Sequence, residues 1–129
     1  MTRDEFSRWL ALYEEAWRTA GTTMLAELFA PDATYSAGPY EELHRGLDAI
    51  VELWDAEREG PDEVFTIERE VVAVEGRTGV ARVHVVYGDP PGQEYRDLWI
   101  VTIDGDGRGV SFEEWPFWPP GTNGTVAGT

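Results

Sequence analysis

Helical and strand-like patterns occupy separate parts of this 129-residue chain, and this separation limits the fold more than any other feature. Apolar residues recur at helical spacing over most of the chain up to residue 59, whereas β-rich stretches fill residues 64–118. Such a separation indicates an α+β domain, in which helices cover one face of an antiparallel sheet. No internal repeat or linker is visible, so we expect one domain over residues 1–118. Residues 119–129 contain almost no apolar side chain, and we expect a flexible tail there.

The helical part divides into three predicted helices, over residues 2–20, 23–29 and 47–59. Thr2 and Glu5 have the spacing of a capping box, which satisfies free backbone N–H groups at the start of the first helix. That helix also carries one apolar stripe, made by Phe6, Leu10, Tyr13 and Trp17.

The β-rich part predicts four long strands joined by glycine-containing turns. A fifth, short strand is expected at residues 34–36, between the second and third helices, and a loop follows it up to Gly46. The four long strands are Val64–Val74, Gly79–Tyr87, Glu94–Ile103 and Gly109–Trp118.

The charge of the chain excludes several classes of partner. Ten Lys and Arg residues against 25 Asp and Glu residues give a net charge of −15, which repels nucleic acids and anionic membranes. The absence of cysteine excludes disulfides and thiolate zinc sites. No apolar run is long enough to cross a membrane and none resembles a signal peptide, so we expect a cytoplasmic protein.

A bound metal or cofactor is not expected either. The two histidines, His44 and His84, are 40 residues apart and no ligand-spacing motif surrounds them. The segment Asp104–Gly107 begins like a calcium-binding loop, but Trp115 stands at the twelfth position, where such a loop needs a glutamate. We therefore interpret this segment as a hairpin turn.

Three stretches resemble one known group of domains: ALYEEAWRTAGTTMLAELFAPDATY, HRGLDAIVELW and WIVTIDGDGRGVSFEEW. They are similar to the nuclear transport factor 2-like superfamily, and more narrowly to SnoaL-like domains, a group that includes ketosteroid isomerases and polyketide cyclases. The resemblance covers residues 3–118. It implies a cone-shaped, cystatin-like fold in which three helices pack on a strongly curved, mostly antiparallel sheet. This fold carries enzymes, ligand binders and interaction modules, so it does not define an activity.

The ketosteroid isomerases provide a comparison of catalytic positions. Tyr13 falls where those enzymes carry the tyrosine that donates to the enolate. The stretch that holds their catalytic base is Ser36-Ala37-Gly38 here, without a carboxylate, and their second oxyanion donor matches Trp99. We therefore do not expect isomerisation by that apparatus. The pattern Pro39-Tyr40, Arg45-Gly46 and Glu114-Trp115 is more similar to an uncharacterised branch of these domains.

Strand periodicity suggests an acid/base pair. The resemblance places Trp99 on the concave face, so Asp97 lies there too, and on the last strand it turns Phe112 and Glu114 inward. Burial among aromatic rings raises the pKa of a carboxylic acid. A carboxyl with a raised pKa next to an ionised carboxylate forms a usable acid/base pair. We expect Glu114 to transfer protons and Tyr13 to donate a hydrogen bond to a substrate oxygen. Asp97 is expected to be the second carboxylate, in an orienting or an ionised role. The expected ligand-pocket residues are Trp17, Tyr40, Trp54, His84, Trp99, Phe112 and Trp118.

Structural alternatives exist for these residues. Glu114 would be a buried structural acid, Tyr13 a pocket-wall or core residue, Tyr40 a surface residue and Tyr35 a packing residue. If Ala81, Val83, Val85 and Tyr87 face the pocket, His84 points outward. If His84 is on the inner face instead, it lies in the pocket and is a candidate general base.

Two functions follow from this site. The first is a cofactor-free acid/base enzyme, of isomerase, cyclase, dehydratase or epoxide hydrolase type, that acts on an apolar cyclic or polycyclic molecule. The second is a non-catalytic ligand-binding or dimerisation module of the same fold. Leu98 and Ile100 lie on the opposite, convex face, where a monomer would expose them, so we expect a homodimer packed sheet to sheet.

Overall fold

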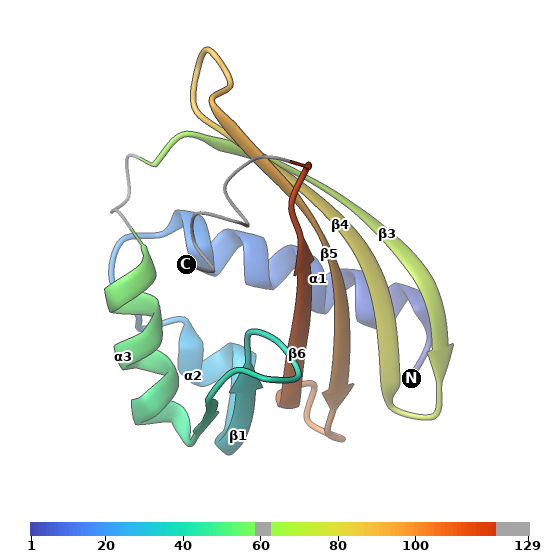
Figure 1. Cartoon of the computed structure of the whole chain (residues 1–129). Coiled ribbons are helices and arrows are strands. Elements are labelled where there is room, and N and C mark those ends of the chain that lie inside the picture. Colours follow the sequence, from blue (N-terminus) through green and yellow to red (C-terminus); the bar gives the residue numbers. More distant parts are fainter. Residues whose placement is uncertain (59–62, 121–129) are drawn as a thin grey trace.

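The computed structural model describes residues 1–58 and 63–120 and places three helices on the concave side of a curved sheet (Figure 1). Helix α1 (Arg3–Arg18) lies along the long strands, and α2 (Leu25–Leu28) and α3 (Leu47–Glu57) cover the other end of the sheet. The predicted flexible tail lies outside the described residues from position 121 onward, as does the last residue, 59, of the third predicted helix. The α+β, cone-shaped fold predicted from the sequence is confirmed.

The sheet contains six strands in the spatial order β2-β1-β6-β5-β4-β3. All neighbouring strands are antiparallel except β1 and β6, which pair in parallel. The strands are β1 (Phe29–Ser36), β2 (Leu43–Arg45), β3 (Phe65–Glu75), β4 (Thr78–Tyr87), β5 (Gln93–Ile103) and β6 (Gly109–Phe117).

Two regions between α1 and α3 differ from the sequence prediction. Strand β1 begins at Phe29 rather than at Thr34, because Phe29 already pairs with Gly109 of β6 and the register shifts before Thr34. The second helix is correspondingly reduced to four residues. The segment predicted as a loop contains β2, in which His44 pairs with Tyr35 of β1. Pairing with distant strands therefore overrides local sequence signals here.

The core lies between α1 and the concave face of the sheet. The capping box of Thr2 and Glu5 is present, and the apolar stripe of α1 is turned toward the strands. Buried and less buried residues alternate along β5, which places Asp97, Trp99 and Val101 on the concave face. The Asp104 side chain accepts hydrogen bonds from the backbone N–H groups of Asp106 and Arg108, as expected for a hairpin turn.

Candidate functional site

A cavity of about 110 Å³ lies between α1 and the sheet. Its walls are mainly aromatic, and the charged side chains among its described lining residues are all carboxyl groups. The lining consists of Tyr13, Glu14, Trp17, Tyr35, Glu57, Phe65, Ile67, Val85, Tyr87, Tyr95, Trp99 and Glu114.

Asp97 of β5 and Glu114 of β6 meet at the inner end of this cavity. Glu114 is paired directly with Trp99 in the strand register, and Asp97 precedes Trp99 by two residues, so all three side chains share one face. Asp97 is only 2% exposed and does not line the cavity, whereas Glu114 does. Both side chains are on the concave face, as expected from the strand parity, but Glu114 lines the cavity and Asp97 is buried outside its lining.

The two carboxyl groups hydrogen-bond to each other, and burial raises the pKa of both. The pKa of Glu114 lies well above its usual value because its charged form loses hydration and because Asp97 is next to it. Trp99 Nε1 donates to Oδ2 of Asp97 at 2.9 Å, and no N–H or hydroxyl donor of the described residues reaches the buried Oδ1. A proton held between the two carboxyl groups would supply the missing donor, and burial favours this protonated form of the pair.

Two tyrosines lie in the same cavity wall. The hydroxyl groups of Tyr13 and Tyr35 are 2.7 Å apart and buried. Burial raises the pKa of both phenols well above the ordinary value, and both groups are therefore neutral. One hydroxyl proton is used within the pair, and the other can be donated to a ligand or to Glu114. Tyr35, interpreted from the sequence as a packing residue, thus also lines the cavity.

Further aromatic residues hold these tyrosines in place. Phe112 stacks on Tyr13 and on Tyr35, with ring centroids 5.2 and 4.5 Å apart. The Trp54 ring meets Tyr13 edge to face at 5.2 Å. Phe112 and Trp54 were expected to line the pocket, but both are fully buried behind its lining residues. They therefore position the wall and do not contact a ligand in the cavity.

Three other predicted pocket residues lie away from the cavity lining. His84 is on the outer face of the sheet, where Nε2 lies 2.6 Å from Glu94 and Nδ1 lies 3.7 Å from Glu68. The placement of His84 in the pocket is thereby corrected, because the apolar residues that alternate with it fill the concave face. Tyr40 is fully exposed in the loop before β2. Trp118 packs on Tyr95, a lining residue, with ring centroids 4.8 Å apart.

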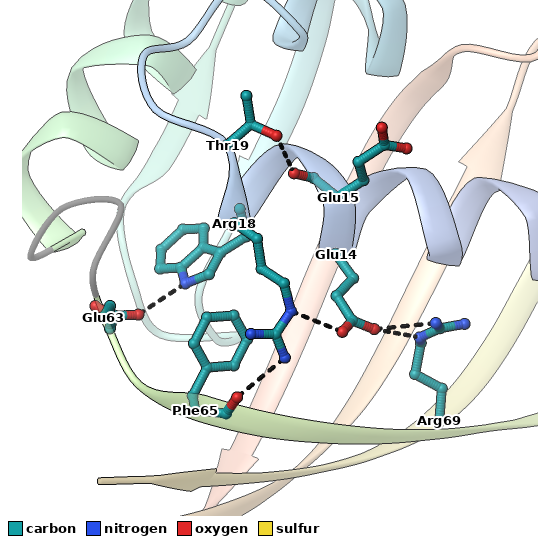
Figure 2. A network of polar contacts seen from close by, with 8 residues as sticks. Glu14, Glu15, Arg18, Thr19, Glu63, Phe65 and Arg69 are labelled. Atoms are coloured by element: carbon teal, nitrogen blue, oxygen red, sulfur yellow. Dashed lines mark hydrogen bonds and ion pairs between the residues drawn. The ribbon is translucent and has the colours of Figure 1, made fainter.

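Arginines close to the cavity wall are engaged elsewhere (Figure 2). Glu14 lies between Arg18 and Arg69, at 2.9 and 3.0 Å. The Arg18 guanidinium stacks on the Phe65 ring at 3.9 Å and donates to the Phe65 carbonyl. Trp17, adjacent in α1, donates from Nε1 to Glu63 at 2.9 Å. This network attaches the end of α1 to the start of β3.

Sequence reasoning also missed other lining residues, among them Glu57 and Tyr95. Glu57 follows Trp54 by three residues on α3, a spacing that places both on the same side of a helix. It stands at the rim, where loss of hydration raises its pKa. Tyr95 precedes Asp97 by two residues, so strand parity contained the signal that it faces inward.

Metal-binding and membrane-spanning features were also sought in the structure. Across residues 1–58 and 63–120, no group of three His, Asp or Glu side chains is arranged to hold a metal ion. Within the same ranges, no helix is sufficiently long and apolar to cross a membrane.

Several solved structures have the same fold. A candidate polyketide cyclase from Sinorhizobium meliloti is 25% identical, with a TM-score of 0.64 over 84% of this chain and 94% of that one. An NTF-2 like protein of unknown function from Burkholderia xenovorans is 14% identical, with a TM-score of 0.70 over 97% and 92% of the two chains. A candidate ketosteroid isomerase from Kribbella flavida is 18% identical, with a TM-score of 0.60 over 89% and 74%.

The sequence comparison defines the family. Residues 9–116 match the SnoaL-like domain, and the chain belongs to this family within the NTF2-like superfamily. No curated protein matches the sequence. The resemblance inferred from the sequence motifs is therefore confirmed at the level of the family.

Proposed function

We propose that this SnoaL-like protein binds a small apolar cyclic molecule in the cavity beneath α1 and transfers protons to and from it with its own side chains. The observation that supports this most strongly is the buried Asp97–Glu114 pair, in which Glu114, whose pKa lies well above its usual value, faces the cavity. A neutral carboxylic acid at physiological pH is a competent general acid. The similarity to a candidate polyketide cyclase, at 25% identity, is consistent with such chemistry.

The arrangement suggests a role for each group. Glu114 donates its proton to an oxygen of the ligand, and Tyr13 donates a hydrogen bond to the same oxygen and stabilises its charge. Glu114 is then a carboxylate next to Asp97, and the repulsion between the two charges makes it a base that regains a proton. One residue thus moves a proton in both directions, as isomerase, cyclase and dehydratase reactions require.

A second candidate function is ligand binding without chemistry. It is favoured by Ser36-Ala37-Gly38, which provides no carboxylate at the edge of the cavity, and by the burial of Asp97 behind Glu114. In this case Glu114 would be a fixed hydrogen-bond donor to the ligand.

Proton exchange separates the two candidates. The probe is 2-indanone in D₂O, whose α-protons exchange when its carbonyl is enolised, and exchange is followed by proton NMR. We expect the wild type to accelerate exchange. In Glu114→Gln the exchange rate should be lower by a factor of ~10²–10⁴, while the ketone still binds. Glu113→Gln, whose side chain bonds to Trp115 on the opposite face of β6, is the matched control and keeps the wild-type rate.

Unchanged exchange in Glu114→Gln would contradict the role of this residue. Binding of 2-indanone by the wild type without accelerated exchange would favour the non-catalytic binder.

A further inference from the structure

The cavity continues outward into a second, more open space. The inner chamber, of about 110 Å³, and an outer hollow of about 430 Å³ share Glu57 and Tyr87 as lining residues. The outer hollow lies beside the β4–β5 hairpin, which extends past the neighbouring strands in Figure 1. An engineered apolar cavity of about 150 Å³ binds benzene, so the inner chamber, at about 110 Å³, can take no more than a single ring. The remainder of a larger ligand would pass Glu57 into the outer hollow.

The charged groups around this passage are acidic. Among the described residues that line the two spaces, the charged side chains are Glu14, Glu57, Glu63 and Glu114. Glu14 is neutralised by Arg18 and Arg69, and burial next to Asp97 favours the protonated form of Glu114. Within residues 1–58 and 63–120, the Glu57 carboxyl makes no hydrogen bond or close ion pair, and its charged neighbour is His44, which acts to lower its pKa. Its negative charge is therefore available to a ligand.

Aromatic rings line the inner chamber together with this carboxylate. Trp17, Tyr87 and Tyr95 all line the cavity, and the two tyrosine rings stack with centroids 6.0 Å apart. The faces of such rings attract cations, and aromatic cages recognise ammonium groups in this way. Arg18 already occupies a face of the neighbouring Phe65, which shows that rings in this wall accept a cation.

The nearby arginine already faces one of these rings, since the Arg58 guanidinium lies over the Trp17 ring at 6.0 Å, so a ligand cation would meet Tyr87 and Tyr95. Arg58, the residue after Glu57, donates to the backbone carbonyls of Thr19 and Gly21 at 2.9 and 2.6 Å. Its guanidinium is therefore committed to the segment that follows α1, and it does not line either space.

From these contacts we infer that the ligand combines an apolar ring with a cationic group, such as a protonated amine, which lies between the aromatic rim and Glu57. This inference rests on the proposed function, since it names the class of molecule that enters the same cavity. The net charge of −15 attracts cations and repels anions at long range. It therefore favours the same ligand charge as the carboxylates that line the cavity.

Three probes with one carbon frame test the inference: 2-phenylethylammonium, 2-phenylethanol and phenylacetate. Their binding to the whole protein is measured by calorimetry at pH 7.5 and low salt. We expect the ammonium to bind about threefold to tenfold more tightly than the alcohol, as rim ion pairs and cation–π contacts provide. Phenylacetate is expected to bind more weakly than the alcohol, because it is repelled by Glu57.

Variants of α3 locate the effect. Glu57→Gln should remove most of the preference for the ammonium and leave the affinity for the alcohol unchanged. Glu52→Gln removes the same charge from an exposed position on the same helix and should keep the preference.

Equal affinities for the ammonium and the alcohol, a preference that survives Glu57→Gln, or no binding of the ammonium would each overturn the inference. The first two results leave the cavity and the 2-indanone exchange assay intact, so a failure here is distinct from a failure of the proposed function.

Discussion

Glu114 contributes to the stability of the fold as well as to the chemistry of the cavity. Its pKa is raised in the folded state, so the folded protein binds this proton more tightly than the unfolded chain does. The stabilisation is complete below the unfolded pKa of about 4.3 and is lost as the pH rises through the raised folded pKa. We therefore expect the Glu114 contribution to the free energy of unfolding to fall as the pH rises above about 4.3 toward the raised pKa of the folded state.

The variant Glu114→Gln isolates this contribution. Its amide keeps an N–H donor for Asp97 but has no proton to lose, so its stability should fall less over the same pH range. Urea unfolding at several pH values measures the difference. Glu15→Gln, at an exposed position of α1, should follow the wild-type curve. Parallel pH profiles for all three proteins would contradict a raised pKa for Glu114.

For some site residues, the face of the sheet on which the side chain lies could be predicted from the alternation of residues along a strand. Asp97 and Glu114 share a face with Trp99 in two long strands, so one reference position fixed their orientation. Tyr35 could not be assigned, because it reaches the cavity through the parallel pairing of β1 with β6, opposite Phe112. His84 remained open, because apolar residues occur on both faces of β4.

At the scale of elements, the packing of α1 on β4 depends on Gly79. A Cβ atom at this position would lie 2.5 Å from Cδ2 and 2.7 Å from Cζ of Phe6, a ring that is completely buried. We expect Gly79→Ala to lower the free energy of unfolding by about 1–3 kcal/mol, because the ring or the helix must move. Chemical denaturation measures this loss.

Gly105→Ala is the control for this prediction. An added Cβ at Gly105, in the turn between β5 and β6, would meet no atom within 4 Å, so stability should change by less than about 0.5 kcal/mol. Equal stability of the two variants would show that α1 does not approach β4 as closely as described.

Helices and strands whose ends carry a cap or turn signal in the sequence could be predicted. A strand that forms only by pairing with another strand could not. The capping box marked the start of α1, and the turn at Asp104 separated β5 from β6. Strand β2 is only three residues long and exists through its pairing with β1, so no local pattern marked it.

At the scale of the whole molecule, the outer face of the sheet supports the prediction of a homodimer. Leu98 and Ile100 point to this face and are only partly buried by their own chain, and Val80 and Trp115 are their neighbours in the strand register. An apolar strip rimmed by charged residues, here Arg82 beside Leu98 and Glu113 beside Ile100, is typical of an interface. We expect sedimentation equilibrium to give about twice the chain mass of 14.5 kDa.

A substitution in this strip should dissociate the dimer. Leu98→Lys is expected to shift the protein toward the monomer, whereas Val72→Lys, at an exposed position of edge strand β3, should not. A concentration-independent mass near 14.5 kDa for the wild type would contradict the prediction.

The central claim is that Glu114 holds a proton at neutral pH because it is buried next to Asp97. A carbon-13 NMR titration of the glutamate carboxyl groups tests it directly, with the Glu114 signal assigned by its absence in Glu114→Gln. We predict a titration midpoint well above the usual range, and a lower midpoint in Asp97→Asn, where the neighbouring charge is removed. A Glu114 midpoint near the ordinary value of about 4.3 would contradict the account.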